Sequence, residues 1–175
     1  MIEVDSDNTA PKPNYLKNLG SAAKTRLHQL TQERWAQEWE TGTTGRTTRL
    51  LTPSPRRDIL QLHMTLPKPL SSIIVQMRTE KIGLKWFLSQ WKVPDVTSAD
   101  CECGRGNQTV RHVLLACPKF NDLRREVWNR GTTRPARMDL REILNTPKLA
   151  RKAASFIIQT RLLGQFGAIL QNEIS

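Results

Sequence analysis

The sequence has few aromatic residues, few acidic residues and no long apolar run. Aromatic side chains make up 6% of its 175 residues, and 16 Asp and Glu stand against 27 Lys and Arg. No apolar stretch approaches the roughly 20 residues that a membrane-spanning helix needs. The first residues, MIEVDSDNTAPKPN, are acidic and lack the apolar centre of a secretory signal. We therefore expect no membrane partner and an intracellular location, nuclear or cytoplasmic.

The residue patterns that catalysis requires are also missing from the sequence. Its carboxylates are scattered, and Asp95 and Asp100, which flank a loop, form no pair suited to acid–base or two-metal chemistry. The Gly-Arg-Gly run at 104–106 is too short for a phosphate-binding loop. We expect no catalytic residue, no small-molecule substrate and no enzymatic activity.

Positive charge is concentrated toward the C-terminus. The formal net charge is +11, and residues 101–175 carry 13 basic but only six acidic side chains. A positive field of this size favours polyanions, nucleic acid first. A solvated basic surface that only maintains solubility is an equally good explanation of the charge alone.

Apolar residues recur at helical spacing, which predicts an all-α fold: a small helical domain with one zinc-knuckle insert. No stretch shows the period-two alternation of a strand. We expect a flexible leader at 1–19, a helical segment at 20–95, the zinc knuckle and its following helix at 96–131, and a C-terminal helical segment at 132–175 that packs on the same core. The predicted helices lie at about 22–40, 55–66, 70–79, 84–91, 110–116, 121–130, 139–145 and 148–171.

Several details of these helices are also predicted. Residues 43–55, TTGRTTRLLTPSP, are rich in Thr and Pro and should be extended or irregular. Ser54 should cap the helix that follows it. The last helix should be the longest, and close helix packing would explain why it keeps Gly164 and Gly167. The helical spacing of four tryptophans favours core positions for Trp35, Trp39, Trp86 and Trp91.

All three cysteines and one of the three histidines lie in CECGRGNQTVRHVLLACP, with the spacing C-x-C-x8-H-x4-C. In a reducing compartment, clustered cysteines indicate a metal site before they indicate disulfides. Thiolate sulfur and imidazole nitrogen are ligands that zinc prefers, and four of them complete a tetrahedral shell. We predict one structural Zn²⁺ held by Cys101, Cys103, His112 and Cys117. Gly104 allows a tight turn that brings backbone N–H groups toward the sulfurs.

The end of the segment is consistent with this prediction. Asn107 or Thr109 can cap a short helix that presents His112. Cys117 follows five residues after His112, so a regular helix would point the two side chains apart. Pro118 moves Cys117 out of the α region, which ends the helix and allows the thiol to turn back toward the metal.

Two other interpretations of these four residues stay open. They fit ordinary buried thiols beside a helical histidine. They also fit a Cys–His nucleophile pair, although that chemistry needs a third orienting group and an oxyanion site, and the sequence supplies no orienting group.

Basic residues surround the predicted ligands. Together they could hold phosphates, and an exposed Trp128 could stack on an unpaired base. Taken singly, each cation fits a solvated surface better, and Trp128 shares its helix with Leu123 and Val127, which favours a core position. The predicted nucleic-acid-binding residues are Arg105, Arg111, Lys119, Arg124, Arg125 and Arg130.

The runs SSIIVQMRTEKIGLKWFL, VPDV and CECGRGNQTVRHVLLACPKFNDLR resemble the C-terminal tail of LINE-type (non-LTR) retrotransposon reverse transcriptases, especially fungal ones. The W-x3-W of Trp35 and Trp39 and the TRLLGQF at 160–166 resemble it too, so the likeness covers about residues 20–170. It implies zinc ligands at Cys101, Cys103, His112 and Cys117 and a role in gripping template RNA or target DNA. By this resemblance, we expect the chain to start after the point where both catalytic domains of that family end.

The departures from the family limit what the resemblance implies. The sequence has no Y-x-D-D polymerase motif and no spaced carboxylates for RNase H. We therefore expect a non-catalytic, zinc-binding module whose partner is RNA or DNA. The alternatives are a structural or protein-interaction zinc domain, and a retroelement remnant without a selected function.

Overall fold

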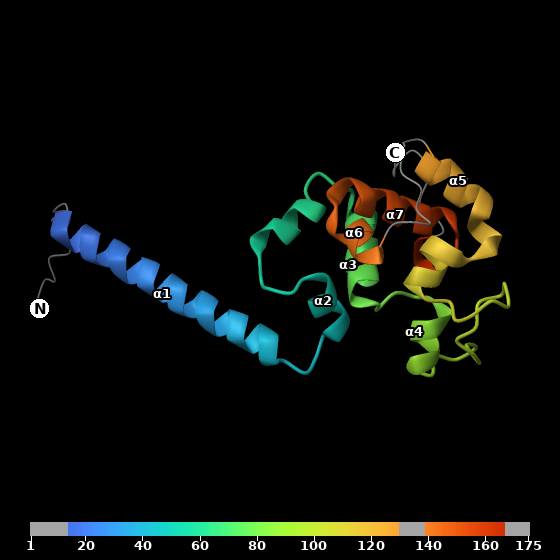
Figure 1. Ribbon diagram of the computed structural model, residues 1–175, viewed down its shortest axis with the longest axis horizontal. Helices are drawn as coiled ribbons and strands as arrows, with labels where there is room; N and C mark the ends of the chain where they lie inside the picture. Colours follow the sequence, from blue (N-terminus) through green and yellow to red (C-terminus); the bar gives the residue numbers. More distant parts are fainter. Residues whose placement is uncertain (1–13, 130–138, 167–175) are drawn as a thin grey trace, which may run out of the picture. The chain divides into compact units, whose positions relative to one another are not determined.

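The computed structural model describes residues 14–129 and 139–166, and it divides the chain into two compact units, Met1–Gly42 and Thr43–Ser175 (Figure 1). In the first unit the described residues form helix α1 (Asn14–Thr41) and the turn after it. The first thirteen residues of the expected leader lie outside the described part. The described residues contain helices and no strand, which confirms the all-α fold.

The second unit is built from short helical elements. Its α-helices are α2 (Arg46–Leu51), α3 (Lys68–Thr79), α4 (Lys85–Gln90), α5 (Asn121–Asn129), α6 (Leu140–Asn145) and α7 (Pro147–Gln159). Its other helical elements are short: the 3₁₀ helices η1 (Arg57–Leu62), η3 (Pro118–Phe120) and η5 (Gly164–Phe166), and the π-helix η2 (His112–Ala116). None of the described helices combines the length and the apolar character that crossing a bilayer requires.

Helix α7 is the centre of the second unit, because α3, α5, α6, η1 and η2 all pack against it. Its buried residues Ala150, Ala153, Ala154 and Ile157 follow the i, i+3, i+4, i+7 spacing of one helix face. Phe156 is also buried and meets the ring of Phe120 edge to face, with 6.2 Å between centroids. Small alanines allow close approach of the neighbouring helices, so the single turn η2 reaches the core.

A buried arginine fastens α2, α3 and α6 together. Arg78 lies on α3, and its Nη1 donates to the carbonyl of Leu144 at 2.5 Å and to Asn145 Oδ1 at 2.7 Å. Its Nη2 donates to Thr52 Oγ1 at 2.6 Å. Asn145 in turn donates from Nδ2 to the carbonyl of Leu51 at 2.8 Å. A buried charge needs such complete pairing, because its desolvation otherwise costs several kcal/mol.

Several predicted elements differ from the observed ones. Helix α1 begins eight residues earlier than expected, and the supposedly irregular segment 43–55 contains α2. Ser54 caps no helix; a 3₁₀ turn begins at Arg57 instead, without a side-chain cap. The predicted helix 148–171 was wrong in extent: α7 stops at Gln159, and Arg161 adopts a left-handed φ of 54°.

The packing roles expected for some residues are wrong as well. Trp35 and Trp91 are exposed, while Trp39 and Trp86 are only half-buried. A Cβ on Gly164 would meet no atom within 4 Å, so close helix packing does not account for that glycine. Gly167 lies outside the described residues. In contrast, Trp128 is fully buried, as its neighbours on α5 predicted.

Candidate metal centre

The first two cysteines lie in a tight backbone loop. The loop is closed at its base by hydrogen bonds from Gln108 N–H to the Ala99 carbonyl and from Cys101 N–H to the Gly106 carbonyl, both 2.8 Å. Within it, Gly104 N–H donates to the Cys101 carbonyl at 2.9 Å. Gly104 has a φ of 68°, a left-handed value that glycine adopts at no steric cost. The turn predicted after Cys103 is therefore present.

The other two ligands are carried by the ends of one π-helical turn. The N–H of His112 is capped by Thr109 Oγ1 at 3.1 Å. At the far end, Cys117 N–H donates to the His112 carbonyl at 2.7 Å, five residues back. Cys117 itself is extended, with φ −64° and ψ 119°, and Pro118 follows it. The expected helix end at Cys117 is confirmed; the π-turn, which accommodates the extra residue of the spacing, was not predicted.

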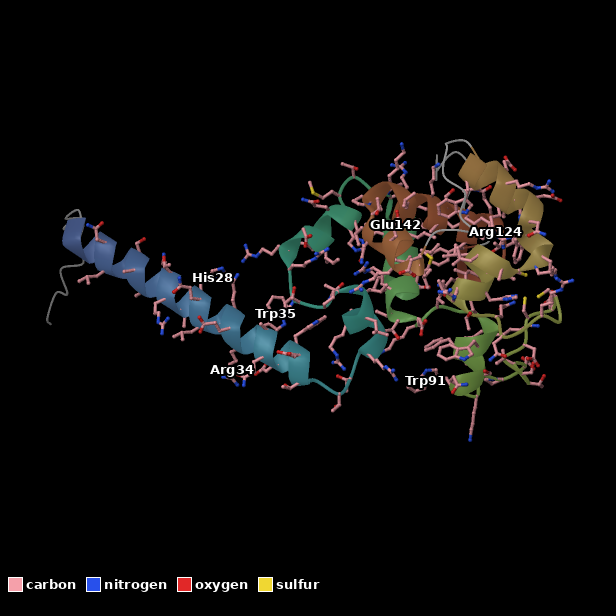
Figure 2. All side chains as sticks on the ribbon, viewed as in Figure 1. His28, Arg34, Trp35, Trp91, Arg124 and Glu142 are labelled. Carbon is pink, nitrogen blue, oxygen red and sulfur yellow. The ribbon has the colours of Figure 1, made fainter. Side chains whose placement is uncertain are left out.

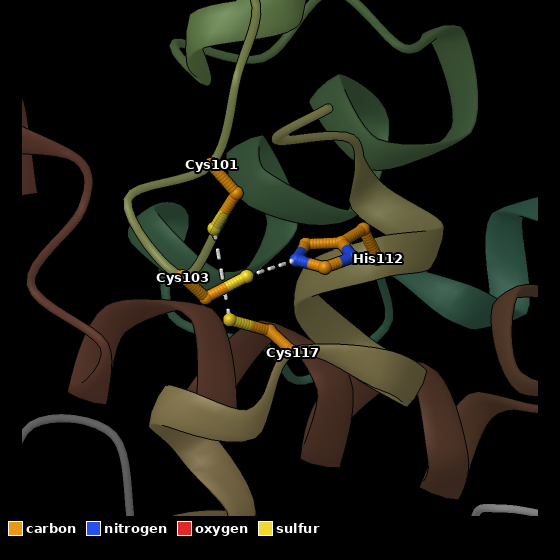
Figure 3. A group of neighbouring side chains, drawn as sticks. All are labelled: Cys101, Cys103, His112 and Cys117. Carbon is orange, nitrogen blue, oxygen red and sulfur yellow. Dashed lines mark hydrogen bonds between the residues drawn. The ribbon is translucent and has the colours of Figure 1, made fainter. Parts of the chain in front are cut away.

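The structure brings together all four predicted ligands (Figure 3). Their ligand atoms, three Sγ and one imidazole nitrogen, lie within 4.8 Å of one another. Cys101 Sγ lies 3.6 Å from Cys117 Sγ, and Cys103 Sγ lies 3.2 Å from His112 Nε2. Cys101 and Cys117 are buried, whereas Cys103 and His112 are partly accessible.

This arrangement fits a tetrahedral metal ion. Bonds of about 2.3 Å to sulfur and about 2.0 Å to nitrogen place tetrahedral sulfurs about 3.8 Å apart, and a sulfur and a nitrogen about 3.6 Å apart. The observed contacts are shorter by only a few tenths of an ångström. Small side-chain rotations about a shared centre therefore suffice to complete the shell, and the four residues lie close enough to bind a metal ion.

The protonation of the ligands is governed by burial and crowding. Burial, together with the neighbouring thiols of Cys101 and Cys103, raises the pKa of Cys117 to about 12, although the Lys119 backbone N–H opposes the shift. Burial also raises the pKa of Cys103, but hydrogen bonds, led by the Arg105 backbone N–H, outweigh it and the net pKa is lowered. A divalent cation would remove the repulsion between adjacent thiolates, which is why this crowded group is suited to a metal.

The imidazole of His112 is available as a neutral ligand. Burial and the nearby charge of Arg124 both lower its pKa from the usual value of 6.5. The neutral imidazole is the form that binds metals, and its Nε2 is the nitrogen that faces Cys103.

Arg124 is the residue that holds the π-turn against α5, and it is only 8% exposed (Figure 2). Its Nε donates to the Leu114 carbonyl at 2.8 Å, and its Nη2 donates to the carbonyls of Cys117 at 2.9 Å and Val113 at 3.2 Å. Its Nη1 donates to Asn121 Oδ1 at 2.8 Å. The expectation that Arg124 binds nucleic acid needs correction, because its guanidinium is occupied inside the protein.

Two more of the predicted nucleic-acid-binding cations are held by carboxylates. Lys119 Nζ lies 2.5 Å from Glu102 Oε2, and Lys85 Nζ lies 3.4 Å from Glu102 Oε1. Hydrogen bonds and charges from these two lysines, Lys119 first, lower the pKa of Glu102. Arg125 pairs with Asp122 one turn earlier on α5.

Of the remaining cations, Arg105 and Arg111 are exposed on the metal-binding segment, and neither has an ion pair within the described part of the chain. Arg130 lies outside the described residues. The structural role of Arg124 was not predicted from the sequence, although one signal was available. Arg124 lies four residues before Trp128 and so shares its buried helix face.

Together, the fold and the site define a small all-α protein with a metal-binding centre of three cysteines and one histidine. No protein-family model, curated protein or solved structure matches the chain.

Proposed function

We propose that the chain is a non-catalytic module in which one structural Zn²⁺ organises a basic surface for binding RNA or DNA. The observation that carries the zinc assignment is the convergence of three thiols and one imidazole within 4.8 Å. Sulfur-rich tetrahedral sites select zinc among the common divalent ions. Four protein ligands also leave no open position for a reactive water, which favours a structural over a hydrolytic role.

Charge supports the nucleic-acid part of the proposal. The chain carries a formal +11, and Arg105 and Arg111 extend from the same segment that holds the ligands. Guanidinium groups are suited to phosphate oxygens, and these two lie on a loop and a helical turn that a metal would tie together. The resemblance to the tail of LINE-type reverse transcriptases, whose zinc-binding region has a similar pattern, points to the same class of partner.

A second candidate is a structural or protein-interaction zinc domain, and one observation favours it. Lys119, Arg124 and Arg125 all bond to groups of the protein itself, so fewer cations are free for phosphates than the sequence suggests. In this alternative the metal only holds the helices together, and the chain binds nucleic acid no more tightly than any equally basic protein does.

The zinc assignment is tested by elemental analysis of the full chain after exhaustive dialysis. We expect one zinc per chain, and we expect chelation to lower the unfolding temperature because metal binding and folding are coupled. Metal-free protein with an unchanged unfolding transition would contradict the structural role.

The nucleic-acid proposal is tested by measuring affinity as a function of salt. Each phosphate contact contributes a slope of about −0.9 in log K against log salt for duplex DNA and about −0.7 for single strands. The double variant Arg105→Gln/Arg111→Gln should make the slope shallower by up to about two such contacts. Arg141→Gln, an exposed site on α6, serves as the control. Equal slopes for wild type and both variants would favour the second candidate.

A further inference from the structure

Helix α4 ends in a tryptophan that faces solvent. Trp91 is 69% exposed, the highest value among the exposed large apolar side chains of the described residues. Its ring packs in a tilted arrangement against the ring of Phe87, one turn earlier on α4, with 6.2 Å between centroids and 56° between ring planes. Phe87 is half-buried, so Trp91 is the exposed member of the pair, and exposed tryptophan is enriched at binding surfaces.

The backbone holds Trp91 in place. After it, Lys92 N–H donates to the Ser89 carbonyl and Val93 N–H donates to the Leu88 carbonyl, both at 3.1 Å. This pair of bonds is the Schellman motif that closes a helix, and it requires a left-handed residue at the position of Lys92. Lys92 has a φ of 49°, a conformation that glycine adopts more readily. Lys92 is exposed and directly follows Trp91 in the chain.

The segment that carries Trp91 has more basic than acidic residues. Residues 80–95, EKIGLKWFLSQWKVPD, include three lysines and two carboxylates, and the carboxylates, Glu80 and Asp95, lie at its two ends. The start of α4 is also tied to the metal-binding loop, because Lys85 N–H donates to Gln108 Oε1 at 2.9 Å and Lys85 Nζ pairs with Glu102. Helix α4, which carries the aromatic pair, is thus joined to the metal-binding loop by two contacts of Lys85.

We propose that Trp91, supported by Phe87, is a stacking platform for an unpaired base, and that the partner of this module is therefore single-stranded nucleic acid. This inference rests on the proposed function and names its substrate class. An exposed ring on a segment that carries three lysines matches what single strands offer, a base with two free faces and a flexible phosphate chain. In a duplex the bases are already stacked on one another and cannot reach the ring.

The test compares Trp91→Ala with wild type for binding to a fluorescein-labelled oligothymidylate, an oligouridylate and a blunt-ended, mixed-sequence DNA duplex. For the single strands we expect a loss of about 5- to 150-fold in affinity, the range for removing one base–aromatic stack. The salt slope should stay unchanged because no charge is removed. Affinity for the duplex should also be unchanged.

Two further variants serve as controls for the stacking interpretation. Trp91→Tyr retains a ring and should recover most of the lost affinity. Trp35→Ala removes another exposed tryptophan, 50% exposed on α1 in the first unit, and should bind like wild type. Zinc content and unfolding temperature, measured for each variant, exclude misfolding as the cause.

The outcomes separate this inference from the proposed function. If wild-type protein binds no nucleic acid above a charge-matched basic control, the proposed function fails. If it binds but Trp91→Ala binds single strands as well as wild type, or Trp35→Ala loses as much, the stacking role alone is overturned. Equal losses on duplex and single strand would also overturn it, since they would show a general surface effect.

Discussion

Replacing Arg124 with methionine tests the architecture of the metal centre most directly. The substitution keeps the apolar stem of the side chain but removes the guanidinium that bonds to the carbonyls of Val113, Leu114 and Cys117. The Cys117 carbonyl keeps a donor, the N–H of Phe120 at 3.2 Å. The N–H of residue 118 is missing because that residue is proline, so it offers no substitute donor at the end of the π-turn.

The expected cost follows from these contacts. A buried acceptor that loses its partner costs about 1–3 kcal/mol, and the carbonyls of Val113 and Leu114 are the two most affected. Removing a buried charge recovers part of its desolvation cost, so we expect a net loss of about 2–4 kcal/mol. For a chain of this size that corresponds to a fall of about 5–15 °C in the unfolding temperature. Zinc affinity should fall too, because the π-turn that Arg124 holds carries His112 and Cys117.

The assay is thermal and denaturant unfolding of zinc-loaded protein, combined with zinc competition against a chromophoric chelator. Arg125→Met is the matched control: its side chain is 72% exposed and paired with Asp122, so its loss should cost less than about 1 kcal/mol. If Arg124→Met and Arg125→Met unfold alike, the assignment of Arg124 as the residue that holds the metal-binding turn is refuted.

Three further predictions concern the ligands and the core. Cys117→Ser should abolish tight zinc binding, measured by elemental analysis after dialysis, because only two thiolates and one imidazole remain. Zinc binding should release protons, at least one of them from Cys117, because its pKa of about 12 keeps the free thiol protonated at neutral pH. Zinc affinity should therefore fall as pH is lowered. Calorimetry in buffers of different ionisation enthalpy measures the number of protons released. Arg78→Met should destabilise the protein by about 2–4 kcal/mol yet leave zinc affinity unchanged, since its partners are on α2 and α6; a parallel loss of zinc affinity in chelator competition would contradict this.

Local patterns accounted for much of the fold. The apolar spacing predicted α3 and α6 to within two residues, and the proline after Cys117 predicted where the helix of the metal segment ends. The prediction failed for the end of α7. There the apolar stripe continues through Leu163, which is buried, but the backbone turns at Arg161 and reaches that buried position without a helix. The apolar pattern shows which residues can be buried. It cannot distinguish a continuous helix from a turn that brings the same residue into the core.

The sequence by itself determined the four ligands, because thiol and imidazole chemistry and a glycine and a proline at the turns are properties of the residues and their immediate neighbours. Only the tertiary structure decided which cations face solvent and which are buried. Arg124 and Arg125 are adjacent and chemically identical, yet one is enclosed beneath the π-turn and the other is exposed. The same holds for Trp128 and Trp91, one fully buried and one exposed. Burial depends on segments that arrive from elsewhere in the chain, and this information is not contained in local spacing.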